Sequence, residues 1–276
     1  MNARIRVCAV LTAFNRRWKT LSSLRAFFEQ RYNCDLRAVL MDDGSTDGTA
    51  ESVQREFDNV TILKGDGTLF WNRGMAAAYK AAHILGADYY LWLNDDTNLY
   101  PDALGKLISD ADSLLNPSGC IIVGSTLDPE TRLLTYGGVR ACSKWHTGRF
   151  IWVEPRDQVQ PCDTMNGNVV LISATAAQTI GPIDEHFSHS MGDLDYGFRA
   201  NGTGVTLVVG RGFHGECQRN PLNNIWYHLG TVRERCKRVN SPTGLPMKEW
   251  AYFLRKHGHA NWPLVWLVTY RRIITG

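Results

Sequence analysis

The sequence predicts an α/β fold in which a mostly parallel central sheet is flanked by helices. Short apolar runs alternate with segments of helical spacing along residues 5–93. Such alternation is typical of right-handed βαβ units, whose parallel strands are covered on both faces. No Gly/Ser linker, internal repeat or low-complexity tract divides the 276 residues, so we expect one large domain rather than two small ones.

The expected elements of the first half follow one another closely. The strands are apolar runs at residues 5–11, 36–41, 60–63 and 89–93. The helices between them carry apolar residues three or four apart and cover residues 18–30, 49–57 and 75–85. After residue 116 the pattern is less regular, with strands expected at 133–139, 149–153, 168–172 and 205–209. We therefore expect a domain over residues 1–222, including a small subregion, and a helical C-terminal tail over residues 223–276.

Composition excludes several classes of protein. Hydrophobic residues make up 44% of the chain and charged residues 21%, which is ordinary for a folded domain and excludes wholesale disorder, collagen and a coiled coil. The 30 Lys and Arg against 27 Asp and Glu give a net charge of 30 − 27 = +3. This near-balance gives no reason to expect nucleic-acid binding.

Cysteine usage and the N-terminus predict a cytoplasmic protein. The seven cysteines are widely spread and include no C-x-x-C pair, which favours reduced thiols. A zinc site built from Cys142, His146 and Cys162 lacks a recognised spacing. The first apolar run is too short for a signal peptide, and no segment reaches the roughly 18–20 apolar residues of a membrane span.

Polar loops follow all four expected strands of the first half. Their sequences are Thr12-Ala13-Phe14-Asn15-Arg16, Asp42-Asp43-Gly44-Ser45-Thr46-Asp47-Gly48-Thr49, Gly65-Asp66-Gly67 leading to Trp71-Asn72-Arg73-Gly74, and Asn94-Asp95-Asp96-Thr97. Ligands of parallel α/β sheets bind beyond the carboxyl ends of the strands. The four loops therefore predict one binding site at that edge.

The adjacent carboxylates Asp95 and Asp96 predict a metal site. Two neighbouring carboxylates ionise together only beside positive charge, and a hard divalent cation with oxygen ligands meets that need. The alternative for an isolated Asp-Asp pair is a turn or a cap for the helix that begins near Pro101. Its place among the other polar loops favours the metal.

The loop after residue 41 imitates a calcium-binding loop from Asp43 to Gly48. We exclude this interpretation because the twelfth position is Gln54 instead of Glu, and because a strand precedes the loop where the motif needs a helix. A turn in which Asp47 caps the following helix fits better. The carboxylates of Asp42 and Asp43 would then be free to bind a base or a ribose.

Taken in order and spacing, these four loops resemble family 2 glycosyltransferases of the GT-A fold, with Rossmann-like sheets, over residues 5–215. The resemblance implies a metal-assisted, inverting transfer of a sugar from a nucleotide-sugar to a hydroxyl. It divides the domain into a nucleotide-sugar half, residues 1–116, and an acceptor half, residues 117–222. The donor-binding residues it implies are Thr12, Phe14, Asn15, Arg16, Asp42, Asp43, Asp66, Trp71, Asn72, Arg73, Asn94 and Asp95. For Trp71, core packing is an equal alternative.

The same resemblance assigns the acceptor side. Members carry Glu-Asp-x-Asp before an Arg-containing helix, and here the segment reads Gly192-Asp193-Leu194-Asp195, so Asp193 takes the place of the general base while Gly192 replaces Glu. Asp195 and Arg199 are four residues apart and can pair on one helix face. Asn166, Gly192 and Asp195 are the implied acceptor-side residues. Asp193 could instead cap the helix.

The resemblance also implies the cofactor and the acceptor. A histidine after the next strand, His214, would join Asp95 and Asp96 in holding Mn²⁺ or Mg²⁺. Bacterial members often build surface polysaccharides or lipid-linked glycans with UDP- or dTDP-sugars, rhamnose donors included. Two other functions stay open. A sugar-phosphate nucleotidyltransferase would need a glycine-rich loop after the first strand, and a non-catalytic nucleotide-sugar-binding module would not need Asp193.

The C-terminal segment mixes aromatic and basic side chains. Residues 250–275 include six aromatic residues, together with Arg255, Lys256, Arg271 and Arg272. Such a helix-compatible segment suits peripheral contact with an anionic membrane at its inner face. Packing of the same aromatics on the domain, or in a homodimer, is the alternative.

Overall fold

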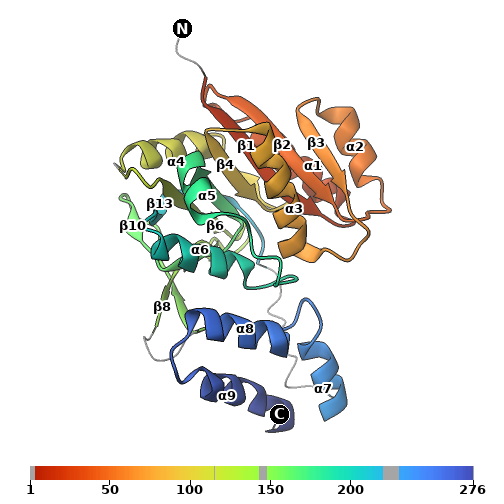
Figure 1. The fold of residues 1–276 in the computed structure, drawn as a ribbon. Helices are drawn as coiled ribbons and strands as arrows, with labels where there is room; N and C mark the ends of the chain where they lie inside the picture. Colours follow the sequence, from red (N-terminus) through yellow and green to blue (C-terminus); the bar gives the residue numbers. More distant parts are fainter. Residues whose placement is uncertain (1–3, 115, 143–147, 220–229, 276) are drawn as a thin grey trace.

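The computed structural model describes residues 4–114, 116–142, 148–219 and 230–275 (Figure 1). Its ten-stranded sheet has the order β10-β13-β6-β12-β4-β1-β2-β3, with β5 paired to β13 and β7 to β6. The strands of this sheet are β1 (Arg6–Ala13), β2 (Asp35–Asp42), β3 (Val60–Lys64), β4 (Tyr89–Leu93), β5 (Asn98–Leu99), β6 (Cys120–Leu127), β7 (Leu134–Tyr136), β10 (Gln160–Pro161), β12 (Val169–Ser173) and β13 (Thr206–Glu216).

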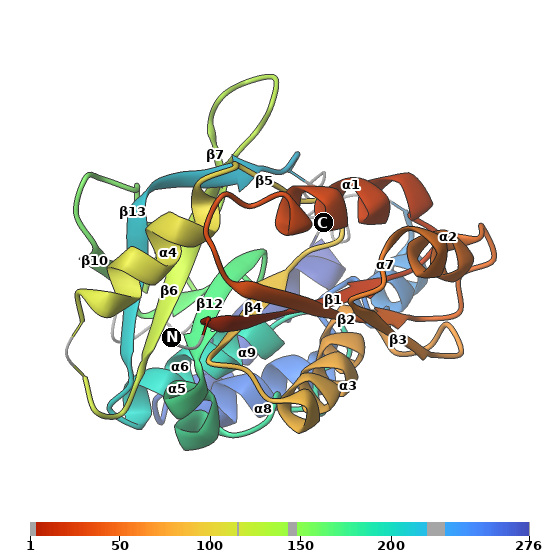
Figure 2. The same ribbon diagram turned by 90° about the horizontal axis from the view of Figure 1, so that it is seen from above.

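Helices cover both faces of the sheet (Figure 2). On one face α1 (Arg17–Phe28), α2 (Thr49–Glu56) and α4 (Ala103–Asp112) share an apolar cluster with alternate residues of the strands. On the other face α3 (Phe70–Leu85), α5 (Ala174–Ile180) and α6 (Gly192–Gly202) form a second cluster around the fully buried Trp92. The expected α/β architecture is thereby confirmed.

The strand pairing is mostly parallel in the first half and mixed in the second. β1 pairs in parallel with β2 and β4, and β2 pairs in parallel with β3. β12 is antiparallel to both of its neighbours, β4 and β6. Residues that precede β12 therefore lie beside residues that follow β4, at the edge where the polar loops of the first half also lie.

Several elements differ from the sequence prediction; the strand expected at 133–139, for example, is divided into β7 and β8 (Gly138–Ala141), which belong to different sheets. Two further differences bear on the site. Helix α3 begins at Phe70 and not at residue 75, because the Asp43 carboxylate accepts hydrogen bonds from the backbone N–H groups of Leu69 and Phe70 and so caps the extra turn. Strand β13 continues through bulges to Glu216 instead of ending at residue 209, because β6 and β5 go on pairing with it.

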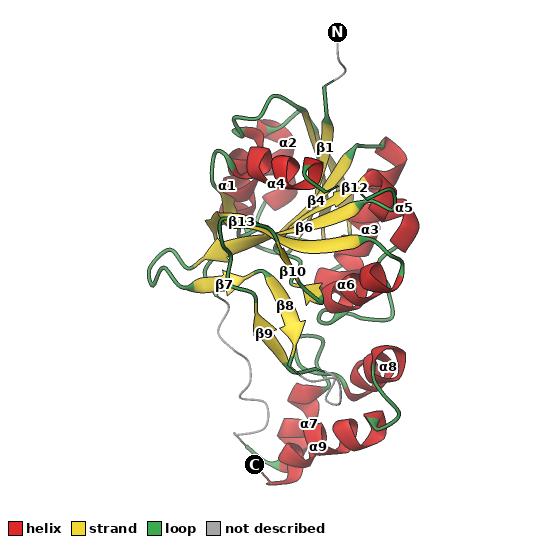
Figure 3. Ribbon diagram, turned by 90° about the vertical axis from the view of Figure 1, so that its left-hand side faces the viewer, coloured by secondary structure: helices red, strands yellow, loops and turns green. Residues whose placement is uncertain are grey.

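A smaller sheet and the tail lie beside α6 (Figure 3). The smaller sheet has the order β11-β8-β9, formed by Thr164–Met165, Gly138–Ala141 and Phe150–Trp152. The tail consists of α7 (Val232–Val239), α8 (Met247–His257) and α9 (Trp262–Thr275), so its helical character is confirmed for these residues. A third apolar cluster, which includes Phe187, Met191 and Phe253, joins the tail to the segment before α6.

The tail boundary expected at residue 223 lies outside the described residues, as does His146 of the zinc alternative. Within the described part of the chain, no helix combines the length and apolarity that crossing a bilayer requires.

Candidate active site

A cavity of about 520 Å³ opens at the carboxyl ends of β1, β2 and β4. It is lined from both halves of the chain by Thr12, Ala13, Phe14, Arg16, Asp43, Phe70, Trp71, Asn94, Asp95, Asp96, Tyr136, Asn166, Gly167, Asn168, His189, Ser190, Met191, Asp193 and Leu194. A second hollow of about 670 Å³ beside α4 contains none of the predicted site residues. The cavity at the strand ends is therefore the candidate site.

Asp95 and Asp96 lie at this cavity, and the guanidinium group of Arg16 lies between their carboxylates. Arg16 Nη1 is 3.2 Å from Asp95 Oδ1 and 2.8 Å from Asp96 Oδ2, and Lys19 Nζ is 3.7 Å from the same Asp96 oxygen. Burial raises the pKa of Asp95 to about 7, against the opposing charge of Arg16 and with a contribution from Asp96. The second oxygen of Asp95, Oδ2, is buried and has no hydrogen-bond partner. The pair thus offers an unused oxygen toward a further cation.

The structure does not bring His214 to the acidic pair. Because β13 continues past residue 209, His214 lies within the strand, fully buried, and its Nδ1 accepts a hydrogen bond from the Ser125 backbone N–H at 3.3 Å. Burial lowers the pKa of this histidine to about 4, and the nearby charges belong to α4 and its N-cap. Within the described ranges, no three His, Cys, Asp or Glu side chains are grouped to hold a metal. The three-residue ligand set expected from the sequence is not assembled.

Asp43 lies at the cavity but its carboxylate is largely engaged. Oδ1 accepts from the Gly67 N–H at 2.9 Å, and Oδ2 accepts from Leu69 and Phe70 at 3.0 Å each. A carboxylate has about four acceptor positions, so roughly one remains for a ligand. Asp42 is not among the cavity-lining residues and accepts from the Ser45 N–H. The expectation that the Asp43 carboxylate is free is therefore corrected, because three of its acceptor positions are used within the protein.

Asn15 and Asp66 shape the loops at the cavity instead of lining it. Asn15 has a positive φ of 53° and its Oδ1 accepts from the Thr46 N–H, which ties the loop after β1 to the loop after β2. Asp66 Oδ1 accepts from the backbone and the hydroxyl of Thr68. Phe14, by contrast, is 51% exposed at the cavity.

Trp71 lies at the boundary between the cavity and the core. Its ring lines the cavity, and it also packs edge-on against Trp92 of the core. The indole N–H donates to Asn94 Oδ1 at 2.8 Å. A Cβ on Gly167 would fall 2.5 Å from the same ring, so glycine is needed where the acceptor half approaches Trp71.

Asn72 and Arg73, which were expected to bind the donor, are not among the residues that line the cavity. Asn72 is fully buried, and its Nδ2 donates to the carbonyl oxygens of Asp184 and Phe187 at 2.8 Å each. Arg73 Nε donates to the carbonyl of Glu185. Both residues hold the segment that leads to α6.

Asp193 lies at the cavity on the first turn of α6. Oδ2 accepts from the Gly167 N–H at 3.0 Å and Oδ1 from the Leu194 N–H at 2.8 Å. Burial raises the pKa of Asp193, and these backbone hydrogen bonds, together with a side-chain bond from Asn166, oppose the rise. A partly buried carboxylate with a raised pKa is suited to receive a proton.

Gly192 and Asp195 lie on the same helix but away from the cavity lining. A Cβ on Gly192 would overlap Asn72 Oδ1, so the side chain of Asn72 occupies the space beside this glycine. Asp195 is fully buried and pairs with Arg199 Nε at 2.8 Å, as the four-residue spacing predicts. Gly192 thus lies beside Asn72, and the partners of Asp195 include Arg199.

Sequence reasoning missed two residues at the site. His189 lines the cavity, and its Nδ1 is buried without a partner. Cys217 Sγ lies 3.6 Å from Asp96 Oδ1, three residues beyond the histidine that was expected there. A single His or Cys in a loop gives no distinctive signal, and it is the fold that brings them to the site: His189 from the segment before α6 and Cys217 from the end of β13.

Comparisons with known proteins match much of this chain to glycosyltransferases. Residues 8–132 match the family model described as glycosyl transferase family 2. The N-acetylglucosaminyl-diphospho-decaprenol L-rhamnosyltransferase of Mycobacterium tuberculosis is 25% identical over 196 residues, which are 62% of this chain and 62% of that protein. The match thus spans less than two thirds of the relative's length.

Solved structures share the fold. A mannosyltransferase from Pyrobaculum calidifontis, in complex with GDP-Man and Mn²⁺, has a TM-score of 0.57 at 15% identity, covering 99% of this chain and 75% of that one. Residues 1–349 of S. aureus TarS, in complex with UDP-GlcNAc, have a TM-score of 0.60 at 12% identity, covering 98% and 73%. The expected GT-A fold is confirmed.

The overlap between a Cβ at Gly192 and the Asn72 side chain predicts that substitutions at these two positions have coupled effects on the free energy of unfolding. Gly192→Ala should lower the free energy of unfolding by about 1–3 kcal/mol, because the new methyl group must displace Asn72. Gly202→Ala on the same helix is the matched control, since nothing lies within 4 Å of its Cβ position. Urea denaturation of Gly192→Ala in the Asn72→Ala background should show a cost below about 0.5 kcal/mol. An equal cost in both backgrounds would refute the steric explanation.

Proposed function

Because residues 8–132 match the glycosyl transferase family 2 model, we propose that this chain transfers a sugar from a nucleoside-diphosphate sugar to a hydroxyl group, with inversion at the anomeric carbon. The single observation that carries this proposal is that Asp95, Asp96 and Asp193 line one cavity. The first two carboxylates come from the nucleotide-sugar half and the third from the acceptor half. A donor and an acceptor bound there would meet between them.

The donor would bind on the side of the first three parallel strands. Phe14 offers an exposed ring for stacking on a base, and Asp43 keeps room for about one hydrogen bond to a ribose hydroxyl. Complexes of proteins with this fold contain GDP-Man or UDP-GlcNAc. For this chain we propose a UDP- or dTDP-sugar. The rhamnosyltransferase relative favours a deoxyhexose such as rhamnose.

The acidic pair fits a divalent cation. Asp95 and Asp96 supply hard oxygen ligands, and Asp95 Oδ2 has no hydrogen-bond partner among the residues that the structure describes. Two carboxylates plus diphosphate oxygens are a usual set for Mg²⁺ or Mn²⁺, so a third protein ligand is not required. When bound, the ion would neutralise charge on the departing nucleoside diphosphate.

Arg16 would change partners when the donor binds. Its guanidinium now lies between the two carboxylates, and its side chain is 40% exposed, so it can move without breaking the core. A diphosphate in the cavity would offer this cation charge-assisted hydrogen bonds. Arg16 would then stabilise the negative charge of the leaving group.

Asp193 would act as the general base. Its carboxylate removes the proton from the acceptor hydroxyl while that oxygen bonds to the anomeric carbon and the bond from this carbon to the diphosphate oxygen breaks. The backbone N–H groups of Gly167 and Leu194 hold the carboxylate in place during this step. No covalent bond forms between sugar and protein.

For the acceptor we propose a saccharide or a lipid-linked glycan of surface polysaccharide biosynthesis, as the decaprenol-linked substrate in the relative's name suggests. The tail would support this by peripheral contact with the inner face of the membrane. Residues 230–275 carry nine Lys and Arg against two Glu, a net charge of 9 − 2 = +7. Along α9, Leu264, Leu267, Val268 and Ile274 are exposed. Cations beside an apolar helix face suit an anionic lipid surface.

Replacement of the base tests the activity. Asp193→Asn should lower turnover by about 10²–10⁴-fold while binding of the nucleotide-sugar persists, because the amide cannot take a proton. In the parent protein only the ionised form of Asp193 is active, so the rate should fall as the pH is lowered. Because burial raises the pKa of Asp193, the midpoint of this fall should lie above the ordinary carboxyl pKa.

The assay measures release of nucleoside diphosphate over a panel of acceptors, with Asp163→Asn as the control carboxylate outside the cavity. Near-parental turnover by Asp193→Asn would contradict the base assignment. Release of pyrophosphate would identify a nucleotidyltransferase, and binding without any turnover would identify a binding module.

The exposed face of α9 predicts binding to anionic vesicles. The double variant Leu267→Glu/Val268→Glu should reduce co-sedimentation with phosphatidylglycerol vesicles by about tenfold or more, because it removes apolar area and adds negative charge. Ile84→Glu is the control, since Ile84 is 81% exposed on α3, in a different helix from the tail. Equal vesicle binding by the double variant and the control would contradict membrane contact. So would a parent protein that binds no vesicles but forms a homodimer that the double variant loses.

A further inference from the structure

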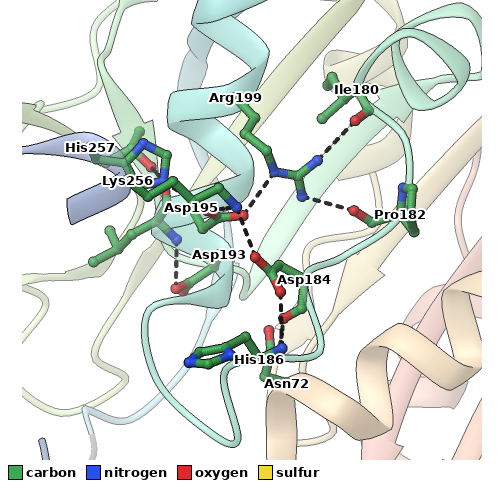
Figure 4. A network of polar contacts seen from close by, with 12 residues as sticks. Asn72, Ile180, Pro182, Asp184, His186, Asp193, Asp195, Arg199, Lys256 and His257 are labelled. Carbon is green, nitrogen blue, oxygen red and sulfur yellow. Dashed lines mark hydrogen bonds and ion pairs between the residues drawn. The ribbon is translucent and has the colours of Figure 1, made fainter. Parts of the chain in front are cut away.

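Lys256 of α8 joins the two ends of the segment that carries the proposed base (Figure 4). Its Nζ lies 2.8 Å from Asp184 Oδ2 and 2.7 Å from Asp195 Oδ1. Asp184 is at the start of this segment, and Asp195 is in the first turn of α6, two residues after Asp193. One ammonium group from the tail therefore closes residues 184–195 into a loop.

This segment is not held by secondary structure of its own. Residues 184–191 form turns and bends, and Met191, just before α6, has a positive φ of 74°. A non-glycine residue in this backbone region is strained, so contacts with the surroundings must hold it there. Asn72 fixes the segment from α3 through two carbonyl oxygens.

Helix α8 supplies the other fixing contacts. Glu249 accepts hydrogen bonds from the backbone N–H and the hydroxyl of Ser188, at 3.2 and 2.8 Å. Tyr252 donates its hydroxyl to Asp184 Oδ2 at 2.9 Å. Together with Lys256, these contacts hold the segment at its start, its middle and its end. The tail thus braces the base-bearing segment along its whole length.

Side chains of the tail help to keep the buried Asp195 carboxylate ionised. It is fully buried, and its partners are Arg199 of its own helix and Lys256 and His257 of α8. An ionised carboxylate only accepts hydrogen bonds, so the His257 ring donates from Nε2, at 2.7 Å. Burial alone would raise the pKa of Asp195, but these hydrogen bonds outweigh it and keep the pKa at about 2. Removal of one cation would leave a buried charge poorly compensated.

We propose that α8 positions the catalytic base, with Lys256 as the positioning residue. Asp193 and Asp195 share the first turn of α6, so a shift of that turn would move the Asp193 carboxylate away from the N–H groups of Gly167 and Leu194. The donor side is built on other elements, because Arg16 and Asp43 follow β1 and β2. Loss of Lys256 therefore impairs proton removal while donor binding remains. This inference rests on the proposed role of Asp193.

The test compares Lys256→Met with Lys248→Met, an exposed lysine of the same helix. We expect Lys256→Met to lower kcat by tenfold or more while the Kd of the nucleotide-sugar changes less than twofold. Lys256→Arg should restore part of the activity, since it retains the positive charge. An unchanged kcat together with unchanged amide exchange at Gly167 and Leu194 would overturn the proposal, and so would a parallel loss of kcat and donor affinity.

Amide hydrogen exchange gives a second readout that does not depend on activity. In Lys256→Met, exchange at Gly167 and Leu194 should accelerate about tenfold or more, whereas exchange at Gly67, which donates to Asp43, should not change. Uniform acceleration at all three amides would overturn the proposal. Faster exchange at Gly167 and Leu194 with unaltered kcat would support the positioning of residues 184–195 by α8 but refute Asp193 as the base. If Lys256→Met does not fold, Tyr252→Phe, which removes one hydrogen bond to Asp184, should shift the same amides in the same direction.

Discussion

The antiparallel pairing of β12 with β4 is the constraint on which the site depends. Because Val169 pairs with Leu93, the residues just before β12 lie beside those just after β4, and the Asn94 N–H donates to the Asn168 carbonyl. The Gly167 N–H then reaches Asp193 on α6. One ladder in the sheet thus sets the spacing between the acidic pair and the proposed base. Every chemical role in our account follows from that spacing.

The second half of the protein is held together by charge as well as by apolar packing. The tail packs on the segment before α6 through an apolar cluster, and it also delivers cations to Asp184 and Asp195. The net charge of the chain is close to zero, but it is unevenly distributed along the sequence. Residues 230–275 carry a net charge of +7, and the remainder carries 3 − 7 = −4. In our account, one part of this excess positive charge faces the base-bearing helix, and another faces the proposed lipid surface.

The sequence predicted the first half of the fold well, because apolar runs and helical spacing report directly on βαβ units. It failed where contacts between distant residues decide the structure. Helix α3 starts early because Asp43, 27 residues before Phe70, caps it. Asn72, expected at the donor, is buried against the Asp184 and Phe187 carbonyls, and no local pattern shows this. His214 lies within a strand that neighbouring strands prolong. The loops of the site were thus predictable, but the direction of individual side chains within them was not.

The central claim is that the acidic pair binds the metal and diphosphate while Asp193 serves a separate step in the same cavity. Electron paramagnetic resonance of Mn²⁺, titrated with and without UDP or dTDP, tests it most directly. We expect the nucleotide to tighten Mn²⁺ binding in the parent and in Asp193→Asn, and Asp96→Asn to weaken that binding by tenfold or more. Unchanged Mn²⁺ binding by Asp96→Asn, or nucleotide binding that is independent of Mn²⁺, would contradict the account.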